Sequence, residues 1–99
     1  MARKLRRSSG NVFRDLGFPA EEAENLRIRS ELMARLSRVI EREGLTQGEA
    51  AQLLGVTQPR VSALMRGKID LFSIDTLVTM LSRMGHRVTV TARARKRVA

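Results

Sequence analysis

Cationic and polar side chains gather between residues 45 and 68, where three cations, Arg60, Arg66 and Lys68, outnumber Glu49, the only acidic residue. The polar side chains of Gln58 and Ser62 precede Arg66 and Lys68 along the chain. Amides and hydroxyls form hydrogen bonds that can distinguish base edges, whereas arginine and lysine neutralise phosphates. The segment therefore has the chemistry of a surface for a polyanion, with groups at one end that can discriminate between bases.

Two short helices are predicted to position these groups. Thr46 and Glu49 form a T-x-x-E capping box that starts the first helix, and Gly55, which is free to adopt a positive φ, ends it. Thr57 offers an N-cap to the second helix, and Pro59 falls in its first turn, where a missing N–H is harmless. The pattern predicts two helices joined by a tight turn.

The second helix has one apolar and one polar side. Val61, Leu64 and Met65 recur at the spacing of a buried stripe, and Gly67 ends the helix. The other side carries Gln58, Arg60, Ser62 and Arg66. This pattern predicts a helix-turn-helix, whose first helix crosses the phosphate backbone while the second lies in the major groove. The alternative is an ordinary helical hairpin with solvated polar sides.

Residues 45–68 resemble the helix-turn-helix of the xenobiotic-response-element family, the class of the phage repressors. The matching residues are Leu45-Thr46-Gln47, Ala50-Ala51, Leu54-Gly55-Val56, Gln58-Pro59, Val61-Ser62 and Arg66-Gly67. By this resemblance, Gln47 hydrogen-bonds a phosphate and braces the next helix. The same resemblance implies that base edges are contacted by Gln58, Pro59, Ser62 and Ala63. We expect phosphates to be contacted by Gln47, Thr57, Arg60, Arg66 and Lys68.

A long helix is predicted from Pro19 to about residue 43. Acidic residues crowd its first turns and arginines its far end, as the helix dipole favours; they are Glu21, Glu22, Glu24, Arg35, Arg38 and Arg42. Its apolar stripe is formed by Leu32, Leu36, Val39 and Ile40. We expect this helix to be scaffold, with its alternating charges forming a solvated face. Another helix, capped by Ser73, is predicted over residues 74–84.

Residues 86–92 alternate polar and apolar side chains and contain several β-branched residues, which predicts a β-strand. A lone strand has no ladder partner in its own chain, so we expect it to pair antiparallel with the same strand of a second subunit. The expected dimer contacts are Val88, Thr89 and Val90. The predicted fold is mainly α, a helical bundle with a lambda-repressor-like helix-turn-helix and one C-terminal β-strand that pairs across a dimer.

The predicted organisation follows from these elements. It comprises a basic, disordered tail (residues 1–8), a packing arm (9–19), the helix-turn-helix DNA-binding domain (20–85), the dimerisation strand (86–92) and a second basic tail (93–99). The arm holds Phe13 and Phe18, two of the chain's three phenylalanines. The sequence leaves open whether the arm packs on the body, merely caps the core or contacts a partner subunit.

The resemblance extends across residues 9–92 to one subgroup, the HigA-like, antitoxin-type regulators. It is carried by the arm at residues 9–18, by Phe72-Ser73 at a helix start, and by Gly85-His86 before the terminal strand. Members of this subgroup pair with a RelE-like, mRNA-cleaving toxin and repress their own operon. Together with the strand pairing expected above, the resemblance predicts a repressor that binds a palindromic operator in double-stranded DNA as a homodimer. The alternative is an antitoxin whose main role is to neutralise a RelE-like toxin.

Composition and motifs argue against an enzyme. The chain has no cysteine, His86 as its only histidine, no phosphate-binding glycine loop and no recognisable catalytic pair of carboxylates. We therefore expect no catalytic residue, no metal and no cofactor. No apolar run approaches the length of a membrane span, so we expect a cytoplasmic protein with no membrane partner. A basic RNA-binding protein is also conceivable, but only three aromatic residues are present and none interleaves with a basic patch.

The formal net charge of +9 lies mostly near the two ends of the chain. Residues 3–7 carry four cations and residues 93–97 carry four more, whereas residues 8–92 hold 11 basic and 10 acidic groups. Beside a helix-turn-helix, such tails are expected to contact phosphates of any sequence; the alternative is that they only keep the protein soluble.

Deletion of residues 1–7 or 93–99 should therefore weaken binding to every DNA duplex. The dependence of affinity on salt should also flatten, because fewer condensed counterions are released on binding. Titrations of labelled duplex at several salt concentrations measure both effects. A salt slope that stays at its full-length value would show that the tails do not contact phosphates.

Overall fold

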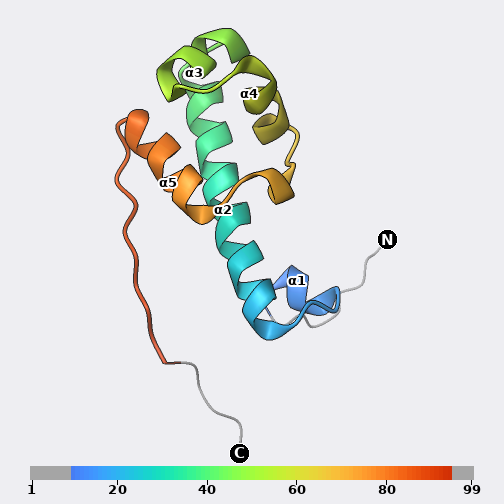
Figure 1. Ribbon diagram of the computed structural model, residues 1–99. Helices are drawn as coiled ribbons and strands as arrows, with labels where there is room; N and C mark the ends of the chain where they lie inside the picture. The colour runs from blue at the N-terminus through green and yellow to red at the C-terminus, as the bar shows by residue number, and fades with distance from the viewer. Residues whose placement is uncertain (1–9, 95–99) are drawn as a thin grey trace, which may run out of the picture.

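The computed structural model of the chain describes residues 10–94, which form helices joined by short turns (Figure 1). The elements are α1 (Val12–Asp15), α2 (Ala20–Arg42), α3 (Gln47–Leu54), α4 (Gln58–Met65), the 3₁₀ turn η1 (Ile69–Leu71) and α5 (Ile74–Arg83). The long helix, the two short helices and the helix capped by Ser73 were all predicted from the sequence, within one residue at each end. Of the two basic tails, only residues 93 and 94 lie within the described part of the chain.

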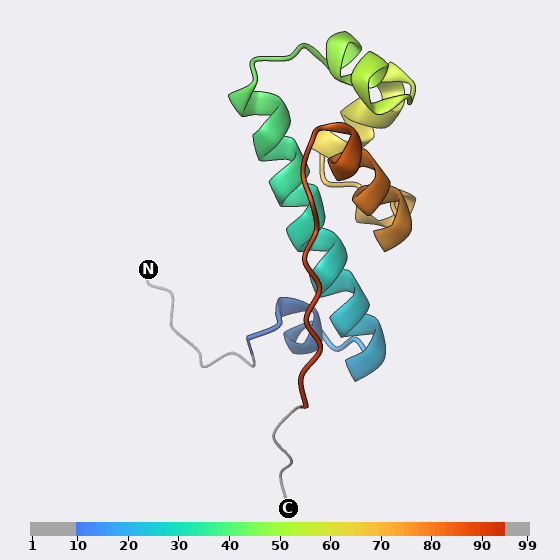
Figure 2. The same ribbon diagram turned by 90° about the vertical axis from the view of Figure 1, so that its left-hand side faces the viewer.

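Helix α2 is the axis of the molecule, and the other helices pack along it (Figures 1 and 2). It follows Pro19 and has Glu21 and Glu22 in its first turn, where carboxylates interact favourably with the helix dipole. Its buried residues are Ala23, Leu26, Met33, Leu36, Val39 and Ile40. In Figure 1, α5 lies on one side of α2, α4 lies on the other, and α3 covers its C-terminal end. The predicted role of α2 as scaffold agrees with this arrangement.

One apolar cluster holds α2, α3, α4 and α5 together. Its buried members are Met33, Leu36, Ile40, Ala50, Ala51, Leu54, Val61, Leu64, Phe72, Leu77, Met80 and Leu81. Phe72 lies between η1 and α5 and is only 1% exposed. Its ring fills the space beneath the connector, residues 66–73 between α4 and α5, as well as the space between helices. Leu32, which the sequence assigned to the stripe of α2, is only half-buried at the edge of this cluster.

The N-terminal arm is a single helical turn that packs against the start of α2. The Asn11 side chain caps α1 by accepting a hydrogen bond from the Phe13 N–H at 2.9 Å, and its amide donates to the Ala23 carbonyl at 3.2 Å. The rings of Phe13 and Phe18 meet edge to face, with centroids 6.2 Å apart. Val12 and Leu16, by contrast, are 60% and 70% exposed.

The predicted β-strand at residues 86–92, and the fold with a strand paired across a dimer, are wrong. The described residues contain helices and no strand. Residues 87–94 run as an extended segment beside α2, without backbone hydrogen bonds to other described residues (Figure 2). Alternation of β-branched residues favours an extended backbone, but a strand also needs a ladder partner, and here the neighbouring element is a helix whose own backbone groups are already paired.

The residues assigned to the strand interface are placed differently from one another. Val88 is half-buried and packs against the helical core, whereas Thr89 is exposed and Val90 is 83% exposed. The single inward valine attaches the segment to the helices, so packing on the chain itself replaces the expected pairing.

None of the helices in the described part of the chain has the length and apolar character that spanning a membrane requires.

Candidate nucleic-acid interface

The predicted capping box starts α3. The Glu49 N–H donates to Thr46 Oγ1 at 3.1 Å, and the Thr46 N–H donates to Glu49 Oε1 at 2.9 Å. These reciprocal bonds satisfy N–H groups that have no partner within the helix. They also engage the carboxylate of Glu49, the one acidic group of residues 45–68, in a local hydrogen bond. The start of α3 is therefore fixed by two neighbouring side chains of the same short segment.

The turn between α3 and α4 depends on Gly55. Its φ is 71°, in the left-handed region, and its N–H donates to the Gln52 carbonyl at 3.3 Å. The Val56 N–H then donates to the Ala51 carbonyl at 3.0 Å, which closes the end of the helix. This geometry turns the chain within two residues and delivers Thr57 to the start of α4.

The N-terminal end of α4 is exposed and carries its polar groups outward. Thr57 is the N-cap, with its Oγ1 accepting from the Arg60 N–H at 3.4 Å, and Pro59 lies in the first turn as predicted. Gln58 and Pro59 are both exposed. The side chain of Gln58 reaches towards the start of α3, because an ideal Cβ on Gly48 would lie 4.0 Å from Gln58 Oε1. The N-termini of α3 and α4 thus form one surface.

The other residues predicted to contact bases lie on the same side of α4 but are less accessible. Ser62 is four residues after Gln58 and three after Pro59, spacings that place side chains next to each other on a helix. Ser62 and Ala63 are half-buried, and Ala63 packs against the core. The structure therefore brings Gln58, Pro59 and Ser62 together at the surface, with Ala63 at the inner edge of this group.

The predicted phosphate contacts fall into two groups. Gln47, Thr57, Arg66 and Lys68 are exposed at the ends of α3 and α4. Arg60 is different, because its guanidinium carbon lies 4.5 Å from the centroid of the Phe72 ring in a cation–π contact. Its charge is thereby placed beside the connector that follows α4, away from the turn.

Two arginines that the sequence did not single out support this interface. Arg29 of α2 donates to the Ile69 carbonyl at 3.1 Å and to the Phe72 carbonyl at 3.5 Å, so it anchors the connector beneath Arg60. Arg83 of α5 lies over the turn, since a Cβ on Gly55 would be 3.1 Å from its Nη1. Both contacts join segments far apart in the sequence, so no local pattern could have revealed them.

The candidate interface carries positive charges that no neighbouring carboxylate neutralises. Residues 57–68 contain no carboxylate, and the ion pairs among the described residues are both made by Arg27 on α2, with Glu24 at 2.6 Å and Glu31 at 2.7 Å. Those carboxylates, the hydrogen bond to Glu24 foremost, raise the pKa of Arg27 above its usual value. Arg60, Arg66 and Lys68 form no ion pair with any described residue, which leaves their charges available to a polyanion.

Two short capped helices joined at a left-handed glycine, with the second exposing its N-terminus, define a helix-turn-helix protein. Residues 12–93 match a family model described as a helix-turn-helix domain, and the chain belongs to this family, in its XRE-like form. Among solved structures, the chain is similar to a protein assigned to the XRE family of transcriptional regulators, with 38% identity and a TM-score of 0.71. That alignment covers 79% of this chain and 90% of the other. No curated protein matches the chain.

Replacing Gly55 by alanine should lower the free energy of unfolding by about 1–2 kcal/mol, because a Cβ is disfavoured in the left-handed region. Removing the neighbouring side chain in the double variant Gly55→Ala/Arg83→Ala should recover little of this loss, since the end of an arginine can move aside. Denaturant unfolding of both variants measures the difference.

Gly44→Ala is the matched control, because Gly44 has a φ of 68° and nothing within 4 Å of its added Cβ. It should lose a similar amount of stability from backbone strain alone. If the double variant regained most of the stability lost by Gly55→Ala, crowding by Arg83 rather than the backbone would be the constraint.

Proposed function

We propose that this protein is a DNA-binding transcriptional regulator that recognises sequence through the N-terminal half of α4. The observation that carries the proposal is the exposed Gln58–Pro59 end of α4, a helix that contains no carboxylate and is followed by the exposed cations Arg66 and Lys68. An amide at this position can form a bidentate pair with adenine in the major groove, and Arg66 and Lys68 suit phosphates. The family match and the XRE-family relative support the same function.

We further propose that the protein represses transcription as a homodimer on a palindromic operator. A helix of eight residues reaches few base pairs, so one copy offers limited specificity. Two copies related by a two-fold axis would place their α4 helices in successive major grooves, about 34 Å apart. This spacing predicts that binding-site selection from random duplexes will return an inverted repeat bound by two chains.

Gln58→Ala should weaken binding to the selected duplex by about 1–3 kcal/mol, because a bidentate base contact is lost. Binding to a duplex of scrambled sequence should change little, since phosphate contacts are untouched. Fluorescence anisotropy on both duplexes at one salt concentration measures the two affinities.

Gln52→Ala is the matched control, because Gln52 is an exposed glutamine near the C-terminal end of α3. It should leave both affinities near the wild-type values. Equal weakening of both duplexes by Gln58→Ala would show that Gln58 does not discriminate between sequences.

A second candidate function is that of an antitoxin that binds a RelE-like, mRNA-cleaving toxin. The observation that favours it is the exposed apolar surface of the N-terminal arm, where Val12 and Leu16 are 60% and 70% exposed on a turn otherwise fixed to α2. Exposed apolar residues side by side suit a protein partner better than DNA. The resemblance of the arm to that of HigA-like proteins supports the same role.

If this second function holds, Val12→Ser/Leu16→Ser should abolish inhibition of a RelE-like nuclease encoded in the same operon. DNA binding should be retained, because the arm lies at the far end of α2 from α3 (Figure 1). An mRNA-cleavage assay with purified nuclease tests the prediction. Failure of the unmodified protein to inhibit that nuclease would exclude the antitoxin role.

A further inference from the structure

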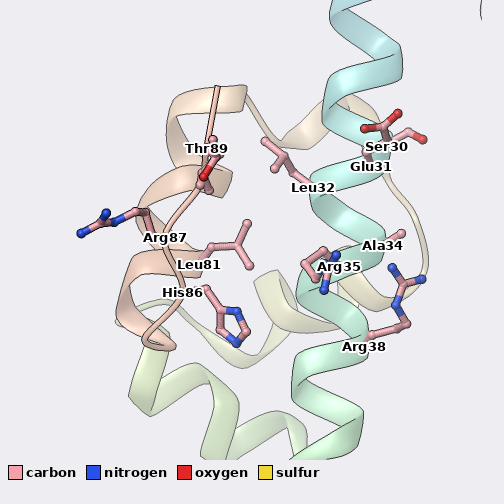
Figure 3. Close-up of a pocket in the computed structure, with 11 residues that line it drawn as sticks. Ser30, Glu31, Leu32, Ala34, Arg35, Arg38, Leu81, His86, Arg87 and Thr89 are labelled. Atoms are coloured by element: carbon pink, nitrogen blue, oxygen red, sulfur yellow. The ribbon is translucent and has the colours of Figure 1, made fainter. Parts of the chain in front are cut away.

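A second cationic site lies away from the recognition helix, in a cleft between α2 and the extended C-terminal segment. The cleft has a volume of about 710 Å³, and Leu32, Arg35 and Arg38 of α2 line one side (Figure 3). Leu81 and residues 86–89 line the other side. This volume falls within the range of roughly 300–1,000 Å³ that is typical of ligand sites. The proposed DNA-binding function does not use this cleft.

The rim of the cleft is positively charged. Arg35 and Arg38 of α2 supply this charge, whereas the side chain of Arg87, on the segment that faces them, extends away from α2 (Figure 3). Glu31 is the one carboxylate in the lining, and its Oε2 already accepts a hydrogen bond from Arg27 at 2.7 Å. Within residues 10–94, neither Arg35 nor Arg38 forms an ion pair. The site therefore concentrates positive charge that the described chain does not neutralise.

The floor of the cleft is apolar and its outer wall is extended backbone. The side chains of Leu32 and Leu81 project into the space between α2 and the segment (Figure 3). Backbone groups of residues 87–89 form no hydrogen bonds with other described residues. An occupant would thus meet cations at the rim, apolar side chains beneath, and free backbone donors and acceptors along one side.

The position of the cleft separates it from the DNA interface. α4 and the C-terminal segment lie on opposite sides of α2 in the view of Figure 1. No residue of α3 or α4 lines the cleft. A duplex bound across the N-terminus of α4 would leave this site open to another anion.

We propose that this cleft binds an extended acidic segment of a protein partner. Carboxylates at alternate positions of such a segment would pair with Arg35 and Arg38, while an intervening apolar side chain would rest on Leu32. Free backbone groups of residues 87–89 match the backbone of an extended peptide, which neither a nucleic acid nor a free phosphate provides. Charge complementarity sets the identity of the occupant as acidic.

The probe is a fluorescein-labelled ten-residue peptide of alternating glutamate and valine, titrated with the full-length protein at low salt. Arg35→Glu/Arg38→Glu should weaken its binding by about tenfold or more, equivalent to about 1.4 kcal/mol, and leave duplex affinity nearly unchanged. Arg66→Glu/Lys68→Glu, with the same change in net charge, should weaken duplex binding and spare the peptide. Circular dichroism checks that both variants fold, since all four positions are exposed.

Several results would overturn the proposal. The proposal is wrong if the peptide does not bind, or if a peptide with lysine in place of glutamate binds equally well. It is also wrong if both double variants weaken peptide binding to the same extent, because that would reflect net charge alone. If a duplex displaces the peptide and loses affinity in the Arg35→Glu/Arg38→Glu variant, the cleft belongs to nucleic acid instead. The duplex titrations test the proposed function separately, because they can fail while the peptide still binds.

Discussion

The orientation of α4 depends on the apolar stripe of α2. Helices of eight residues are too short to be stable alone, because the cost of nucleation is not recovered over so few hydrogen bonds. Val61 and Leu64 of α4 instead share one buried cluster with Met33, Leu36 and Ile40 of α2. The exposed end of α4 is therefore held by burial on its opposite side, and the capping bonds only refine where each helix starts.

Polar contacts then position the stretch between α4 and α5 and the side chain of Arg60. Between α4 and α5 the chain forms only the short 3₁₀ turn η1. Arg29 donates to the carbonyls of Ile69 and Phe72 in this stretch, and the Phe72 ring fills the space below. Arg60 lies on the outer face of that ring, so its cation is placed by a core residue. Apolar packing and the position of one candidate phosphate contact are consequently linked through a single aromatic side chain.

The two sides of α2 have different chemistry, and this division suggests two kinds of partner. One side supports α4 and its cations, which suit the proposed duplex. The other side borders a cleft with an apolar floor and two arginines that form no ion pair with any described residue, which suits the proposed acidic peptide. The exposed apolar arm at the far end is a third surface. A small regulator could in this way bind DNA and protein at once, because the surfaces do not overlap.

Local interactions explain which features the sequence could predict. Thr46 and Glu49, Thr57, Pro59 and Ser73 act within one helical turn, so their types and spacing were enough to locate the starts of α3, α4 and α5. The 3.6-residue period of the apolar positions likewise indicated which sides of α2 and α4 are buried. The same pattern predicted the outward side of α4, because the side opposite a buried stripe faces outward, whereas the candidate base contacts were assigned by resemblance to the XRE family.

Non-local contacts account for what the sequence could not predict. The alternation at residues 86–92 specified an extended backbone, but only the tertiary structure placed this segment beside a helix rather than a second strand. The stacking of Arg60 on Phe72, the position of Arg83 over Gly55 and the cleft beside Arg35 all join residues distant along the chain. Caps, turns and amphipathic periods were determined by the sequence alone, since each depends on neighbours within a few residues. The partners of exposed cations and of the terminal segment were decided only by the packing of helices, which brings those residues together.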